Sequence, residues 1–126
     1  MNLAGIQQAL ELTNLTPEVP LNDSREIAGG YASDLLSDVL AHAPRGGDLV
    51  TIQVHLNVLA VAVHAELAAT AVHAELAAVI FAADRRPEES VRLKAAEEGV
   101  ALFVSSDCAF DIAGRLYALG LRGTHE

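Results

Sequence analysis

Three short apolar runs, each followed by a helix-like pattern, constrain the fold of this 126-residue chain more than any other feature. The runs span residues 48–54, 78–83 and 100–104 and are rich in Val, Ile, Leu and Ala. Such runs, bounded by Gly, Pro or charged residues, are typical of strands that are buried on both faces of a parallel sheet. Repeated strand–helix units therefore predict a single α/β domain over residues 1–126, with three layers and a mainly parallel sheet flanked by helices.

The remaining elements follow from apolar periodicity and from turn residues. Apolar residues at helical spacing predict helices at 3–10, at 34–43 with Ser33 as the N-cap, from residue 55 onward, at 87–99 and at 109–119. Residues 13–24 are expected to form a loop that can include one short edge strand. Residues 26–28 are expected to form a brief strand, which leads through two glycines onto the next helix.

A nine-residue tandem duplication is the least ordinary feature of the sequence, because residues 62–69 and 71–78 both read Ala-Val-His-Ala-Glu-Leu-Ala-Ala. Nine residues advance a helix by two and a half turns, so the second copy would face away from the first. A continuous helix over residues 55–76 would leave Val72 and Leu76 exposed, which favours a homodimer. The alternative is that one copy forms a bulge, a kink or a loop. The strong helix formers in both copies favour the long helix.

The duplication also repeats a histidine, at His55, His64 and His73. Neighbouring histidines would alternate between opposite helix faces, and the two that share a face would lie ~27 Å apart along a helix. These three residues therefore do not form one metal site, and neither a metal nor another cofactor is predicted.

Charge and composition exclude several classes of protein. The 17 acidic and 8 basic residues give a net charge of −9, which repels nucleic acid and anionic membrane surfaces. The N-terminus lacks a secretory signal, and Cys108 is the single cysteine, so a reducing cytoplasmic location is expected. Cys108 itself is expected to be a small buried helix residue. No phosphate-binding Gly-Lys loop, nucleophile elbow or His-Glu-x-x-His motif is present, so no catalytic residue is assigned.

The candidate binding residues are those predicted near the carboxyl ends of the strands, where parallel α/β sheets bind ligands. A helix N-terminus behind two glycines can also hold an anion. A purely structural role is about as well supported as ligand binding for these candidates, because glycines permit tight turns and Ser or Asn side chains cap helices. The candidates are Gly29, Gly30, Ser33, Asp34, Gln53, His55, Asn57, Ser105 and Ser106.

Four segments together make the chain resemble a DRTGG domain: residues 23–30, 31–39, 53–57 and 113–117. The order and spacing of these segments carry the resemblance, although Ser24 and Ala28 depart from the namesake stretch, and the duplication is an insertion relative to the family. The resemblance is greatest to short stand-alone members from anaerobic bacteria and archaea, some of which are encoded near iron-hydrogenase or signalling genes.

The resemblance implies a fold like the amino-terminal domain of bacterial HPr kinase, which serves as an accessory or regulatory module. We therefore expect a non-catalytic regulatory or interaction domain, as a homodimer, that binds a small anionic ligand such as a nucleotide, or a protein partner. Two alternatives stay open. One is an enzyme or phosphocarrier that uses His55 as its acid, base or phosphate acceptor. The other is an assembly factor for a larger, hydrogenase-type enzyme.

Overall fold

A five-stranded sheet forms the centre of the computed structural model, which describes residues 1–21, 26–52, 54 and 76–123. The sheet order is β1-β5-β4-β3-β2. Strands β2, β3, β4 and β5 run parallel, whereas the short β1 pairs antiparallel with β5. The expected mixed α/β fold with a mostly parallel sheet is thus confirmed. The strands are β1 (Thr13–Asn14), β2 (Gly30–Ala32), β3 (Asp48–Thr51), β4 (Ala78–Phe81) and β5 (Ala101–Val104).

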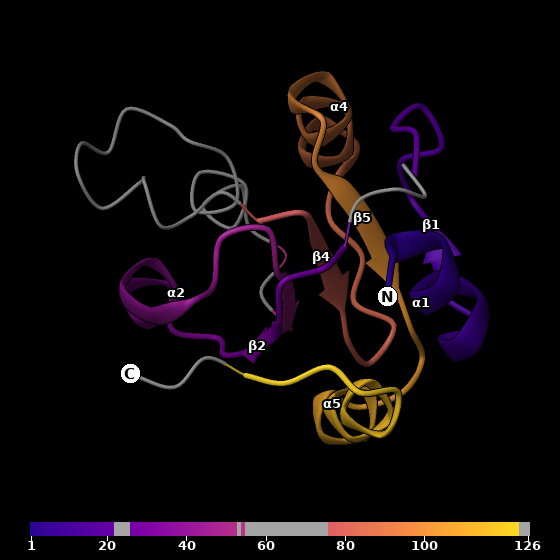
Figure 1. The fold of residues 1–126 in the computed structure, drawn as a ribbon. Helices are drawn as coiled ribbons and strands as arrows, with labels where there is room; N and C mark the ends of the chain where they lie inside the picture. Colours follow the sequence, from indigo (N-terminus) through magenta and orange to yellow (C-terminus); the bar gives the residue numbers. More distant parts are fainter. Residues whose placement is uncertain (22–25, 53, 55–75, 124–126) are drawn as a thin grey trace.

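Helices cover the sheet on two sides (Figure 1). Helices α1 (Leu3–Leu10) and α5 (Ala109–Ala118) share one apolar cluster with the sheet, and helix α2 (Leu36–His42) belongs to a second cluster with the sheet and α4 (Glu89–Glu98). The two clusters use opposite faces of the same strands, so the described elements form three layers.

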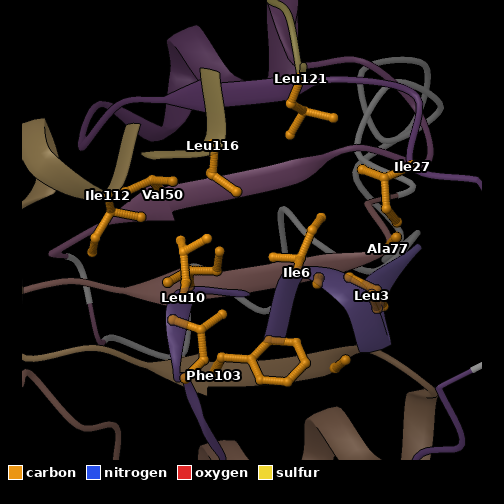
Figure 2. Packing of buried hydrophobic residues seen from close by; sticks show 14 of the residues in the cluster. Leu3, Ile6, Leu10, Ile27, Val50, Ala77, Phe103, Ile112, Leu116 and Leu121 are labelled. Carbon is orange, nitrogen blue, oxygen red and sulfur yellow. The ribbon is translucent and has the colours of Figure 1, made fainter. Parts of the chain in front are cut away.

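Alternation along each strand explains why both faces are apolar. Val50, Ile80 and Phe103 lie in the cluster with α1 and α5. Figure 2 shows Ile6 and Leu10 of α1 on the same side of the sheet as Val50 and Phe103. Their chain neighbours, Leu49, Val79 and Leu102 among them, lie in the cluster on the other face. Successive side chains point to opposite faces of a strand, so burial of both faces requires a continuous apolar run.

The second strand differs from the prediction. It comprises Gly30–Ala32 rather than residues 26–28, because the backbone N–H groups of Ile27 and Ala28 donate to Met1 and Gly46 outside the sheet. Gly29 and Gly30 therefore do not form the predicted strand-to-helix turn.

The cap expected for helix α2 is also wrong. Helix α2 begins at Leu36, and Ser33 accepts a hydrogen bond from the Leu35 N–H (3.1 Å) before the helix starts. Helix α5 follows Cys108, which makes no capping bond through its side chain. Cys108 is exposed, not buried as expected. Ser105 instead accepts a hydrogen bond from the Asp107 N–H at 3.0 Å, within the turn that leads into α5.

The end of the duplication lies in the sheet. Leu76 is only 5% exposed and packs in the cluster that contains Val39 and Leu49, and Ala78 begins β4. The expectation that a long helix ends at an exposed Leu76 is therefore wrong, and it no longer supports a dimer. The rest of the duplication, with Val72, His64 and His73, lies outside the described residues. Among the helices that the structure describes, none is long and apolar enough to cross a membrane.

Candidate functional site

A polar cavity of about 250 Å³ opens at the carboxyl ends of β4 and β5. The end of α1, the turn before α5 and Arg115 in the last turn of α5 complete its wall, so the cavity lies at the edge where ligands bind in parallel α/β sheets. Two guanidinium groups, three carboxylates and several hydroxyl groups line it. The lining residues are Leu10, Glu11, Thr13, Asp84, Arg86, Val104, Ser105, Ser106, Asp107 and Arg115.

Hydrogen bonds hold the two arginines in place but leave some of their N–H donors available. Arg86 donates to Asp84 at 3.3 Å, and Arg115 donates to Asp107 at 2.9 Å and to the carbonyl oxygen of Ala9 at 3.1 Å. Both side chains keep much of their surface exposed, 53% for Arg86 and 43% for Arg115. A guanidinium carries five N–H donors, so each arginine can still bind an anion while its carboxylate partner orients it.

The backbone is strained beside this cavity. Glu11, Ala83 and Asp84 have positive φ angles of 53°, 56° and 56°, and they are the non-glycine residues with positive φ in the described ranges. Ala83 and Asp84, which follow β4 after one intervening residue, donate hydrogen bonds from Ala83 N to Asp107 O and from Asp84 N to Ser105 O, both 2.7 Å. Such strain costs of order 1–3 kcal/mol per residue and gathers at functional sites.

Of the predicted site residues, Ser105 and Ser106 lie in this cavity. Ser33 and Asp34 also follow the carboxyl end of a strand, but β3 and β4 separate that strand, β2, from β5. Asp34 has a structural role, since its Oδ1 accepts hydrogen bonds from the Thr51 hydroxyl and the Ile52 N–H. Gln53, His55 and Asn57 lie outside the described residues, so the role predicted for His55 stays a prediction.

Gly29 and Gly30 lie at the opposite edge, where β2 begins. A Cβ atom on Gly29 would lie 2.8 Å from the carbonyl oxygen of Arg122, and one on Gly47 would lie 2.7 Å from that of Gly29. Close contact between these backbone segments therefore explains the glycine at position 29. Gly30 lines a separate apolar cavity of about 160 Å³ beside α5.

A second polar group lies at the carboxyl end of β2. The Tyr31 hydroxyl donates to Asp38 (2.7 Å), and the same carboxylate contacts the His42 Nδ1 (3.0 Å). Burial, and then the Asp38 carboxylate, raises the pKa of Tyr31 to about 12. The hydrogen bond from Tyr31 lowers the pKa of Asp38, so this carboxylate stays ionised at neutral pH.

Asp48 is a buried acid that the sequence analysis did not single out. It is completely buried at the start of β3, and neither of its carboxylate oxygens has a hydrogen-bond partner within the described structure. Burial raises the pKa of Asp48 to about 7. Its position at the amino end of the parallel strands separates it from the polar cavity.

The sequence carried one unused signal for the cavity. The charged run at residues 84–86 directly follows the apolar run at 78–83, so Asp84 and Arg86 had to lie near the end of a strand. Arg115 has no comparable local signal, because only the packing of α5 brings it to the cavity.

The fold and this cavity define an α/β domain with a charged pocket at the carboxyl ends of its parallel strands. No family model matches the chain, and the search of curated proteins finds no match either. Among the described side chains, no cluster of His, Cys, Asp and Glu has the arrangement that a metal ion needs.

Proposed function

We propose that this chain is a non-catalytic regulatory or interaction domain of the DRTGG type, which acts as a dimer and binds a small anionic ligand. The ligand-binding site is the polar cavity at the ends of β4 and β5. The observation that carries this proposal is the presence of two half-exposed guanidinium groups, Arg86 and Arg115, in the wall of one cavity.

The chemistry of the lining suits binding better than proton transfer. Guanidinium groups stay protonated at physiological pH, and their planar fork matches phosphate and carboxylate oxygens. The hydroxyl groups of Thr13 and Ser106 add neutral donors and acceptors to the wall. Asp84 and Asp107 keep the arginines oriented and favour a ligand that also carries hydroxyl or amino groups.

The size of the cavity limits what it can enclose. Sites for drug-sized ligands are typically ~300–1,000 Å³, and this cavity is about 250 Å³. It can therefore hold a phosphate or carboxylate head group, and the remainder of a nucleotide would extend out of the opening.

Thermal unfolding in the presence of inorganic phosphate and of adenine and guanine nucleotides tests this proposal. A ligand at a hundred times its Kd adds ~2.7 kcal/mol to the stability of the protein that binds it. The shift should disappear in Arg86→Gln. It should persist in Arg85→Gln, a matched control because the neighbouring exposed arginine does not line the cavity. A shift that survives Arg86→Gln, or no shift with any of these ligands, would refute the proposed site.

A further inference from the structure

The polar cavity at the ends of β4 and β5 carries more negative than positive charge. Three carboxylates and two guanidinium groups line it, in a chain whose net charge is −9. Asp84 pairs with Arg86, and Asp107 pairs with Arg115, so the charges of these four side chains balance. The third carboxylate, that of Glu11, forms no hydrogen bond or ion pair within the described part of the chain. The wall of the cavity therefore holds one carboxylate in excess.

The position of Glu11 is unfavourable for an acidic residue. Glu11 directly follows the last residue of α1, and its backbone is left-handed, with a φ angle of 53°. Glycine or asparagine is the usual residue in this conformation at a helix end. The C-terminus of a helix also carries partial negative charge, which repels a carboxylate and attracts a cation. The local structure thus disfavours glutamate at position 11, whereas a cation bound in the cavity would interact favourably with both the carboxylate and the helix terminus.

The two arginines of the cavity do not supply this cation. Arg115 donates to the carbonyl oxygen of Ala9 in the last turn of α1 (3.1 Å), yet it forms no ion pair with Glu11 in the described structure. Arg86 is paired with Asp84 on the loop after β4. Both guanidinium groups still have N–H donors for the acidic group of a ligand. The same cavity therefore offers donors for an acid and a free carboxylate for an amine.

We infer that the ligand of this cavity is a small zwitterion, with a carboxylate or phosphate group at Arg86 and Arg115 and a protonated primary amine at Glu11. The inference rests on the proposed function, because the acidic group occupies the arginine site proposed there. The amine binds the Glu11 carboxylate beside the C-terminus of α1, so each charge of the ligand meets an opposite charge in the wall. An acid without the amine binds the same arginines more weakly, because the charge of Glu11 stays uncompensated.

The size and the neutral lining of the cavity suit such a ligand. Its volume of about 250 Å³ is below the ~300–1,000 Å³ that is typical for drug-sized ligands. The hydroxyl groups of Thr13 and Ser106 can donate to the acidic group or accept from the amine. An amino acid or a phosphorylated amine with few carbon atoms therefore fits with both charged groups inside one cavity.

NMR titration of the backbone amide signals, which suits weak ligands, tests the inference with three matched pairs of small molecules. Each pair comprises an acid that carries a primary amine and a similar acid without it: L-alanine and propionate, γ-aminobutyrate and butyrate, and phosphoethanolamine and ethyl phosphate. In at least one pair, the wild type should bind the amine-bearing member about tenfold or more tightly. The pair that shows this preference distinguishes an α-amino acid, an ω-amino acid and a phosphorylated amine as the source of the zwitterion.

Glu11→Lys separates recognition of charge from damage to the cavity. It should abolish the preference for the amine and tighten the binding of the amine-free acid by about threefold or more, because attraction replaces repulsion. A distorted cavity would bind neither member more tightly. Glu97→Lys is the matched control, since it makes the same charge change at an exposed position in α4, near the end of β5 that is remote from the cavity. This control should retain the preference of the wild type.

The outcomes separate this inference from the proposed function. Equal binding of both members in every pair, or a preference that survives Glu11→Lys, would overturn the zwitterion. In that case, binding of the amine-free acids that is lost in Arg86→Gln would still support the arginine site. Both proposals fail if no member of any pair binds, or if Arg86→Gln leaves the binding unchanged.

Discussion

The carboxylate of Asp34 accepts a hydrogen bond from the hydroxyl of Thr51 (2.8 Å) and a second from the Ile52 N–H (2.8 Å). These bonds connect the segment after β2 to the end of β3. Asp34→Ala should therefore lower the free energy of unfolding by about 1–3 kcal/mol, whereas Asp34→Asn should cost less, because its amide oxygen can still accept. Urea unfolding measures both. Equal losses in the two variants would show that the charge, and not the acceptor, matters.

Thr51→Val separates the hydroxyl bond from the backbone bond. The energies of Thr51→Val, Asp34→Ala and the double variant form a double-mutant cycle, which should give a coupling of about 0.5–3 kcal/mol. A coupling of zero would mean that the hydroxyl bond contributes nothing to stability.

Thr16 extends the pairing of β5 beyond the two residues of β1. Its fully buried hydroxyl accepts a hydrogen bond from the Leu102 N–H (3.0 Å), while Leu15 N donates to the Leu102 carbonyl oxygen. Thr16→Val should cost about 1–3 kcal/mol, because it leaves a buried N–H without its acceptor. Thr16→Ser retains the acceptor and should cost clearly less. The prediction fails if the serine variant, assayed by the same urea titration, is as unstable as the valine variant.

Gly114→Ala should stabilise the monomer. The alanine should add about 0.4–1 kcal/mol to the free energy of unfolding, because glycine in a helix interior is less favourable than alanine. The space around position 114 accommodates a methyl group, since nothing lies within 4 Å of it. Thermal unfolding at one protein concentration provides the measurement, and a lower melting temperature would contradict the reading of Gly114 as a residue that the monomer does not need.

The sequence predicted the inner strands well and the edge strand poorly, for one physical reason. Strands β3, β4 and β5 are buried on both faces, so their residues form apolar runs that can be recognised without any alignment. Strand β2 has only three residues, Gly-Tyr-Ala, none of them fully buried, and it lies at the edge of the sheet. Strand β2 is defined by its hydrogen bonds to β3, and the local sequence contains no pattern that predicts this pairing.

Some residues of the candidate site could likewise be predicted from the sequence, and others could not. Ser105 and Ser106 were predicted because they directly follow a recognisable strand. Arg86 and Arg115 are 29 positions apart and meet only after β4, β5 and α5 have packed, so periodicity and motifs could not pair them. Gly29 was read as a turn residue, whereas the structure uses it for a close contact with the backbone of Arg122.

Asp48 should make this domain less stable as the pH rises from about 4 to about 7. Burial raises its pKa to about 7 in the folded chain, and the unfolded value is ~3.9. Between these values the folded state binds more protons than the unfolded state, so stability falls by up to about 1.4 kcal/mol per pH unit. Above a pH of ~7 both states are ionised and the loss, on the order of 4 kcal/mol, is complete.

Asp48→Asn removes this titration while keeping the shape of the side chain, and it isolates the effect. Urea unfolding from about pH 5 to about pH 8 should show a steep fall for the wild type that the variant lacks, with the variant the more stable protein at the upper end. The hydrogen bond from Tyr31 lowers the pKa of Asp38, so that carboxylate loses its stabilising effect only in acid, below this window. Parallel curves for the two proteins would show that Asp48 is not a neutral, buried acid in the folded chain.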